Sequence, residues 1–139
     1  LRSEADRKAI LEGILDGTID MIATDHAPHS AEEKGRGLEK SVFGVVGLET
    51  AFPIMYTYLV KPGIMSMERL LEVMVDAPRK RFNLPLGQDF SIWDLEAEYE
   101  IDAGEFVSMG KATTFNGWKV NGRCKATVCD GKLVYKEEV

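Results

Sequence analysis

The first residues of the chain place apolar and polar side chains with helical spacing. One helical face collects the apolar side chains Ile10, Leu11, Ile14 and Leu15. Ser3, with Asp6 three positions later, resembles a capping box, and Gly17 suits the left-handed conformation that ends many helices. We therefore expect a helix over residues 3–16.

A short apolar segment follows at residues 18–24. Its sequence, TIDMIAT, is rich in β-branched residues, which is typical of a strand buried on both faces of a parallel sheet. Helix, glycine and buried strand together predict the αβ half of a βαβ unit. Residues 31–42 then break the pattern with many charges and two glycines. They predict a long loop of the kind that often carries a binding site or lid.

Three more helices are predicted before residue 85. Apolar spacing indicates a helix over residues 47–60, and its regular part is expected from Thr50, because Pro53 is tolerated only near a helix start or at a kink. Ser66 can cap a helix over residues 67–75. Pro78 can open a short helix over residues 78–82.

After residue 85 the apolar pattern changes to alternation. Strands are predicted at residues 90–95, 98–101, 113–120, 125–129 and 132–135. Asp130-Gly131 lies between the last two and predicts a two-residue hairpin turn. The fold class expected is therefore α/β, with an α/β part over residues 1–85 and an all-β part over residues 86–139.

Composition narrows the class of protein. The chain has 139 residues, of which 45% are hydrophobic and 29% charged, as expected for a soluble globular protein. A net charge of −6 argues against a nucleic-acid surface, which needs clustered Lys and Arg. No apolar run approaches the roughly 20 residues of a membrane-spanning helix. Cys124 and Cys129 are expected to be reduced thiols of a cytoplasmic protein. The chain opens without methionine, so we expect a piece of a longer protein.

Candidate chemistry gathers at residues 25–29, whose sequence is DHAPH. His26 and His29 are the only histidines, and Asp25 stands at the expected end of a buried strand, where functional groups collect in parallel α/β folds. An aspartate there can ligate a metal or take a proton as a general base. Pro28 fixes the direction of His29, which can donate hydrogen bonds to an anionic substrate. A helix cap, a surface turn or a hydrogen-bonded pair would explain these five residues equally well.

A metal would need more ligands than this segment supplies. Zinc usually takes three or four protein ligands, and the two cysteines fall far along the chain in the all-β part. Most ligands are therefore expected outside the chain. Glu49 is expected at a helix start, as a structural residue rather than a ligand. Trp93 and Trp118 are expected in the core or in a subunit contact.

Several stretches together resemble the dihydroorotases of the amidohydrolase superfamily. They are IATDHAPH at positions 22–29, EEK at 32–34, FGVVGLETAFP at 43–53, GKATTF at 110–115, GW at 117–118 and VCDGK at 128–132. The stretches occur in order over almost the whole chain. The DHAPH segment favours the dihydroorotases over the related hydantoinases and allantoinases.

The resemblance implies a fold, a reaction and a set of site residues. The fold is the C-terminal part of a (β/α)8 barrel followed by a share of a small β-sandwich. The reaction is the reversible cyclisation of N-carbamoyl-L-aspartate to L-dihydroorotate in pyrimidine biosynthesis, with one or two zinc ions as cofactor. Asp25 matches a zinc ligand that also serves as general base, and His29 matches a histidine near the substrate carboxylate. Phe43 and Gly44 match a pair whose backbone contacts the substrate ring.

The chain also departs from the pattern of that family. The family's His-x-His motif, its bridging group, two further zinc histidines and an Asn-Pro-Pro stretch before a pair like Leu1-Arg2 are absent, and the segment at residues 86–95 is shortened. The isolated chain is therefore expected to be inactive. Two alternatives remain: a hydantoinase-like or allantoinase-like cyclic amide hydrolase, and a non-catalytic assembly partner that resembles a dihydroorotase. A sheet edge exposed by missing barrel strands predicts a homo-oligomer or a rearranged fold.

Overall fold

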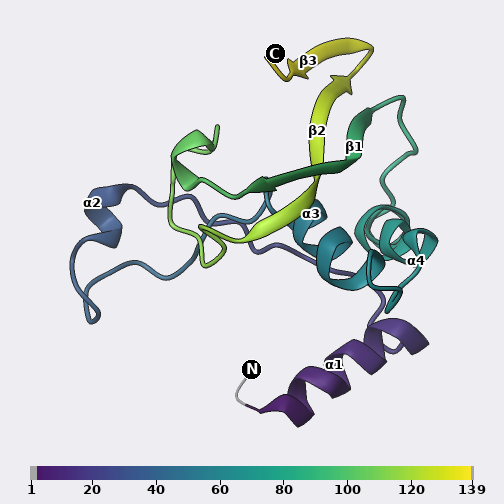
Figure 1. The fold of residues 1–139 in the computed structure, drawn as a ribbon, viewed down its shortest axis with the longest axis horizontal. Helices are drawn as coiled ribbons and strands as arrows, with labels where there is room; N and C mark the ends of the chain where they lie inside the picture. Colours follow the sequence, from purple (N-terminus) through teal and green to yellow (C-terminus); the bar gives the residue numbers. More distant parts are fainter. Residues whose placement is uncertain (1–2, 139) are drawn as a thin grey trace.

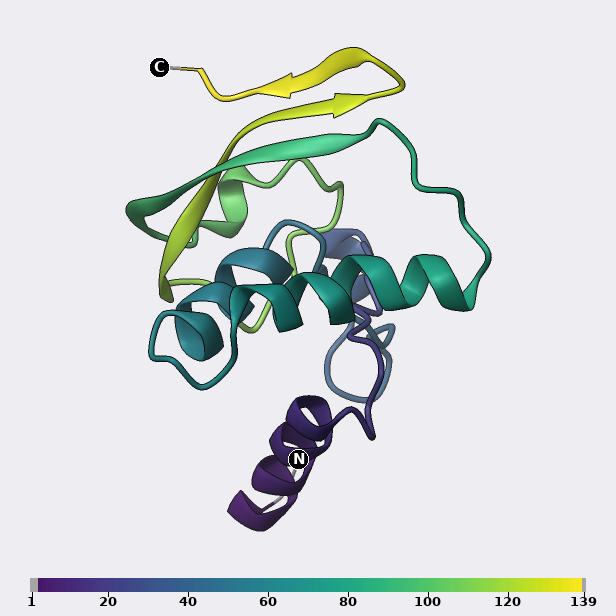
Figure 2. The same ribbon diagram turned by 90° about the vertical axis from the view of Figure 1, so that its right-hand side faces the viewer.

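The structure, a computed structural model, describes residues 3–138, so the Leu1-Arg2 pair of the resemblance lies outside the described residues. Two layers make up most of it: a three-stranded antiparallel sheet, and helices packed below one face of that sheet (Figures 1 and 2). Helix α1 (Glu4–Asp16) projects from the helix layer on the side away from the sheet (Figure 2). Within residues 3–138, no helix has the length and apolar character needed to span a membrane.

Helix α1 confirms the first prediction. The Ser3 hydroxyl accepts a hydrogen bond from the Asp6 amide, the Asp6 carboxylate accepts one from the Ser3 amide, and both bonds are 3.1 Å long. Gly17 ends the helix with a φ of 89°. The guanidinium of Arg69 then ties this end to the helix layer by donating to the Ile14 carbonyl at 2.9 and 2.7 Å.

The strand predicted over residues 18–24 is wrong for this chain. A parallel strand is held by hydrogen bonds to its neighbours, and the sheet among residues 3–138 contains only three antiparallel strands from the later part of the chain. The segment is held by the helix layer instead, because the Ile22 amide donates to the Val73 carbonyl at 3.0 Å. A single parallel bridge, His26 with Val45, follows it.

The polar stretch after this segment is not a plain loop. It opens with a short helix, α2 (Ala31–Lys34), where a loop was predicted. Ser30 and Glu33 form a capping box, in which the Glu33 amide donates to the Ser30 hydroxyl and the Ser30 amide donates to the Glu33 carboxylate. The sequence signal for this helix, Ser followed three residues later by Glu, was present in the chain.

Two continuous helices form the helix layer. The first runs through α3 (Ala51–Met55) and a π-helical turn, η1 (Tyr56–Val60), and begins after Thr50 as predicted. The second runs through α4 (Met67–Leu71), a π-helical turn η2 (Glu72–Asp76) and α5 (Ala77–Arg81). The prediction of two separate helices over residues 67–75 and 78–82 is therefore wrong, although Ser66 does cap the start.

The π-helical turn η2 explains how the second helix passes through Pro78. In this turn the Ala77 amide bonds to the Glu72 carbonyl, five residues back, rather than to that of Val73. The next donor in the same pattern would be residue 78, but proline has no N–H. The Val73 carbonyl is thus left without a partner in its own helix, and it accepts the bond from Ile22.

The sheet has the order β1 (Phe90–Glu100), β2 (Lys119–Cys129) and β3 (Lys132–Lys136). β1 joins two predicted strands across bulges, and β2 extends the strand predicted at 125–129. The strand predicted over 113–120 is wrong before residue 119, because the chain turns there and the Gly117 amide bonds to the Ile101 carbonyl at 2.8 Å. A short 3-10 helix, η3 (Ala103–Glu105), precedes that turn.

Other predictions for the sheet region are confirmed. Asp130 and Gly131 both have positive φ, 50° and 70°, as a two-residue hairpin turn with matching twist requires. Both cysteines are free thiols.

The core joins the two layers. Ile54 from α3 packs with Ile101 and Val120 from the sheet region, and all three are buried. The ring centroid of Trp93 lies 4.4 Å from that of Phe52, so the half-buried Trp93 packs on the helix layer, whereas Trp118 is 42% exposed and lies outside the core, one of the two places predicted for it. The contact of Trp93 with Phe52 fixes the helix that follows residue 50 beneath the sheet.

Candidate active site

Three segments meet around the DHAPH sequence: residues 24–29, residues 43–48 and residues 106–112. The Ala27 amide donates to the Val45 carbonyl at 2.9 Å, and the Val46 amide donates to the Ala112 carbonyl at 2.9 Å. The middle segment therefore bonds to the other two. The site is assembled by these bonds between segments that lie far apart in sequence.

Two glycines allow the segments to approach. Gly44 has a φ of 115°, and a Cβ on it would lie 2.5 Å from the Ala27 Cβ and 3.4 Å from the His29 Nε2. A Cβ on Gly110 would lie 2.7 Å from the Pro28 Cα. Only glycine permits these contacts. They place Gly44 beside His29, and these are two of the residues predicted for the site.

Asp25 stands at a break in the backbone. Its φ of 48° is unusual for a residue other than glycine, although aspartate is among the residues that tolerate this conformation best. The residue is exposed. Among residues 3–138, its carboxylate accepts no hydrogen bond and forms no ion pair, and so it is open to an external partner.

His26 has a structural role that the sequence did not indicate. Its Nδ1 accepts hydrogen bonds from the amides of Gly47 and Leu48, at 3.1 and 3.3 Å. Both bonds use the lone pair of Nδ1, so this nitrogen acts as an acceptor for the loop. His26 thereby holds the DHAPH segment to the loop before α3.

His29 faces a cavity of about 370 Å³. The other residues that line it are Ala31, Lys34, Gly35, Met109, Lys111 and Ala112. The His29 side chain is 26% exposed, and its Nδ1 lies 3.9 Å from the Glu33 carboxylate. Hydrogen bonds from the amide and hydroxyl of Ser30 lower the pKa of Glu33, and the neighbouring His29 contributes in the same direction.

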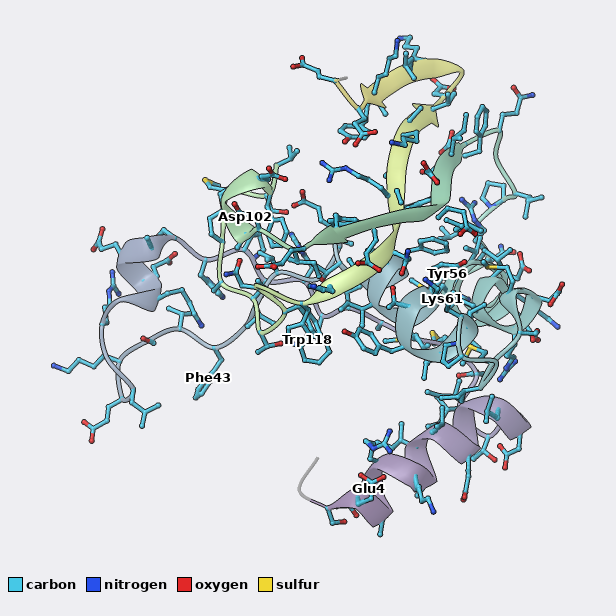
Figure 3. The ribbon with its side chains drawn as sticks, in the orientation of Figure 1. Glu4, Phe43, Tyr56, Lys61, Asp102 and Trp118 are labelled. Carbon is cyan, nitrogen blue, oxygen red and sulfur yellow. The ribbon has the colours of Figure 1, made fainter. Side chains whose placement is uncertain are left out.

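The remaining predicted residue, Phe43, is 93% exposed. Its ring points away from the body of the molecule (Figure 3). The carbonyls on either side of it are held by one side chain, because Lys34 Nζ donates to the carbonyls of Val42 and Gly44, each at 2.9 Å. The Ser41 hydroxyl donates to the Lys34 carbonyl at 2.7 Å.

Glu49 is structural, as predicted, but it does not act at a helix start. It precedes the Thr50 cap and accepts hydrogen bonds from the amides of Val107 and Ser108, at 2.8 and 3.0 Å, and from the Ser108 hydroxyl at 2.6 Å. Burial acts to raise the pKa of Glu49, but the hydrogen bonds from Ser108 and Val107 outweigh it and lower the pKa. Glu49 thus fixes the segment that carries Met109 and Lys111 to the cavity.

The described part of the chain does not assemble a metal site of its own. Nowhere in residues 3–138 do three His, Cys, Asp or Glu side chains gather so that they could hold a metal ion. The structure therefore brings His29 and Gly44 together. Asp25 and Phe43, which lie close to them in the sequence, are exposed to solvent. Both cysteines lie in the sheet.

Comparison with known proteins finds relatives named dihydroorotase and solved structures named hydantoinase or dihydropyrimidinase. No family model matches it. A dihydroorotase of Bacillus cereus (strain AH820) is 49% identical over 145 aligned residues, and one of Halalkalibacterium halodurans is 50% identical; each comparison takes in 99% of this chain and 34% of the relative. The chain spans about a third of the length of the curated relatives it matches.

The aligned length exceeds the 139 residues of the chain, so these relatives carry residues that the chain lacks. Their position, predicted at residues 86–95, stays a prediction.

Solved structures of related proteins match the chain over nearly its whole length. The L-hydantoinase (dihydropyrimidinase) from Arthrobacter aurescens matches with a TM-score of 0.84 and 34% identity, over 96% of this chain and 32% of that one. The dihydropyrimidinase from Brevibacillus agri NCHU1002 matches with a TM-score of 0.86 but 17% identity, over 98% of this chain and 32% of that one, and so shows the fold alone. Over nearly its whole length, the chain is similar to a segment of proteins named dihydroorotase, as the sequence resemblance predicted.

Proposed function

We propose that the chain is the C-terminal portion of a zinc-dependent dihydroorotase. Residues 1–85 would complete a (β/α)8 barrel, and residues 86–139 would supply part of a β-sandwich. The observation that carries the proposal is the close approach of Gly44 to His29 beside the segment that presents Asp25, within a chain that shares about half its residues with dihydroorotases. The proposal places the enzyme in the cytoplasm, in pyrimidine biosynthesis.

The proposed reaction uses Asp25 as general base. In the hydrolytic direction water attacks the ring amide carbonyl of L-dihydroorotate, Asp25 accepts the proton, and the same proton passes to the amide nitrogen as the C–N bond breaks. Cyclisation of N-carbamoyl-L-aspartate reverses these steps. The exposed carboxylate of Asp25, which is free of intramolecular hydrogen bonds among the described residues, suits this role.

We assign substrate binding to the residues around the cavity that His29 lines. His29 would donate a hydrogen bond to the substrate carboxylate, and the backbone at Phe43 and Gly44 would contact the ring. The cavity that His29 lines is also bordered by Lys34 and Lys111, whose positive charges favour an anionic ligand.

The zinc would be held only partly by this chain. A catalytic zinc takes three protein ligands and an open position, and Asp25 is one oxygen ligand of the right kind. The other ligands would come from the rest of the enzyme. When bound, the metal supplies Lewis-acid polarisation of the amide carbonyl.

A hydantoinase-like activity is the second candidate, because the Arthrobacter aurescens protein named L-hydantoinase is 34% identical to this chain. Dihydroorotate carries a carboxylate that hydantoin lacks, so a carboxylate-binding His29 favours dihydroorotate. A non-catalytic assembly partner would lack the His-x-His motif and the later histidines upstream of this chain.

The test uses the complete protein that contains this chain, assayed with L-dihydroorotate and with hydantoin. We expect Asp25→Ala to abolish turnover. We expect His29→Ala to raise KM about tenfold or more while kcat changes little, since a hydrogen bond to a charged group contributes roughly 1.5–3 kcal/mol and about 1.4 kcal/mol corresponds to a factor of ten. Asp20→Ala, an exposed aspartate in the same segment, is the matched control.

Two results would contradict the assignment. A normal rate for Asp25→Ala would show that Asp25 is not the general base. Turnover of hydantoin in preference to dihydroorotate would show that dihydroorotate is not the substrate.

The proposal includes a homo-oligomer. β1 and β3 are the edges of the sheet, and β3 is exposed along its whole length, with Leu133 at 59% and Val134 at 61%. Exposed apolar edge strands pair readily with further strands.

A further inference from the structure

The loop between α2 and the site is closed at its base by one lysine. We name residues 35–43 the cavity loop. Lys34 precedes it, and its Nζ donates at 2.9 Å to the carbonyl of Val42 and at 2.9 Å to that of Gly44. The Val42 amide bonds to the Glu33 carbonyl at 3.4 Å, and the Ser41 hydroxyl bonds to the Lys34 carbonyl at 2.7 Å. The two ends of the cavity loop are thus fastened together.

The two carbonyls that Lys34 holds lie on either side of Phe43. The Val42 carbonyl shares a peptide plane with the Phe43 amide, and the Gly44 carbonyl shares one with the Val45 amide. Holding both planes limits the rotation of the peptide between them. The limit matters because Gly44, at a φ of 115°, has no Cβ to restrict its own backbone.

We infer that Lys34 is a positioning residue, which orients the Phe43-Gly44 backbone for contact with substrate. The inference rests on the proposed function, in which that backbone touches the substrate ring. Lys34 acts through the two carbonyls that it holds and not through the reacting atoms. It also borders the cavity beside His29, so the same side chain connects the cavity loop to the substrate side of the site.

Two measurements on the complete protein test the inference. Lys34→Met keeps the aliphatic stem and removes both hydrogen bonds. We expect KM for dihydroorotate to rise about tenfold, which corresponds to about 1.4 kcal/mol, with kcat within roughly twofold, as is typical when ground-state and transition-state binding are lost equally. We also expect trypsin to cut faster after Arg36, because the base of the cavity loop is no longer fastened.

Lys40→Met is the matched control. Lys40 is an exposed lysine of the same cavity loop whose side chain makes no hydrogen bond within the described residues. Both KM and cleavage after Arg36 should stay at their wild-type values. If Lys34→Met does not fold, Lys34→Arg is the second variant. It keeps donors for both carbonyls, so its cleavage after residue 36 should be as slow as in the wild-type protein.

The outcomes separate the two proposals. Unchanged KM and unchanged cleavage in Lys34→Met would overturn the inference. A raised KM with unchanged cleavage would also overturn it, because that pattern belongs to a charge that attracts substrate without holding the cavity loop. If the wild-type protein does not turn over dihydroorotate, the proposed function fails, and the cleavage comparison still decides whether Lys34 fastens the cavity loop.

Discussion

At Gly110 the backbone passes so close to Pro28 and His29 that no methyl group fits between them. A Cβ on Gly110 would lie 2.7 Å from the Pro28 Cα and 2.8 Å from the His29 nitrogen. Both are backbone atoms, and the ring of Pro28 stiffens the segment that carries them. Because Gly110 has no side chain, its segment, which carries Met109 and Lys111 to the cavity, can lie this close to His29.

We predict that Gly110→Ala destabilises the protein by about 1–3 kcal/mol, the usual range for overpacking a tight contact. The control is Gly87→Ala, because a Cβ on Gly87 would meet its nearest neighbour at 3.8 Å, an ordinary contact. Urea unfolding of both variants of the complete protein, followed by circular dichroism, measures the difference. Equal midpoints for the two variants would show that the Pro28-His29 segment yields to the methyl group.

At the scale of elements, the helix from α4 to α5 holds the segment that presents Asp25. The π-helical turn η2 and the missing N–H of Pro78 together release the Val73 carbonyl, which binds the Ile22 amide at 3.0 Å. The π-helical turn thus leaves the Val73 carbonyl free to accept a hydrogen bond from the segment beside the helix. Ile22 lies three residues before Asp25, so this bond fixes the approach of the DHAPH sequence to the helix layer.

We predict that Pro78→Ala weakens this bond. Alanine restores an N–H that can bond within the helix to the Val73 or Met74 carbonyl, and so it competes with Ile22. Amide hydrogen exchange at Ile22, followed by NMR, should become about fivefold faster, since one hydrogen bond contributes roughly 1 kcal/mol and about 1.4 kcal/mol is a factor of ten. The Ile19 amide, which bonds to the Gly13 carbonyl, is the internal control. An unchanged exchange rate at Ile22 would show that the Val73 carbonyl accepts this bond whether or not residue 78 has an N–H.

Local sequence signals predicted local elements well. The capping box at Ser3, the start of a helix at Thr50 and the hairpin at Asp130 each depend on a few neighbouring residues, and the structure confirms them. The strand predicted at 18–24 depended on partners that the sheet among residues 3–138 does not provide. The two predicted helices around Pro78 merged because a π-helical turn absorbs the proline, which apolar spacing does not reveal.

The resemblance named His29 and Gly44 as site residues with separate roles, and those roles stay predictions. In the structure a Cβ on Gly44 would lie 3.4 Å from the His29 Nε2, a proximity that the resemblance did not specify. The roles of His26 and Lys34 were missed, because each holds backbone groups that lie 8 to 22 residues away. Such bonds depend on how the segments pack, and a residue pattern carries little information about them.

At the scale of the whole molecule, the described residues present the proposed site carboxylate, Asp25, exposed and without a hydrogen-bond partner among them. Three His, Cys, Asp or Glu side chains do not come together anywhere in the described residues 3–138. The chain also spans about a third of its dihydroorotase relatives. The two findings agree with a site that is completed by residues from outside the chain.

We predict that the isolated 139-residue chain has no dihydroorotase activity and binds zinc only weakly, because one carboxylate supplies one of the three protein ligands that a catalytic zinc needs. Titration calorimetry with zinc and an assay with dihydroorotate measure both properties. The complete protein, assayed beside it, shows that substrate and conditions support turnover. Measured turnover by the isolated chain would contradict the prediction.

The tryptophans give this architecture an optical signal of its own. Trp93 in β1 packs on Phe52, and Trp118 packs at 5.3 Å against Tyr58, so each indole from the later part of the chain rests on a ring from the helix layer. If the sheet separates from the helices while both stay folded, the half-buried Trp93 meets water and its emission shifts to longer wavelength while the helical circular dichroism persists. Trp118, which is already 42% exposed, changes less. Intrinsic fluorescence can therefore report whether residues 1–85 and 86–139 part as two units or melt as one.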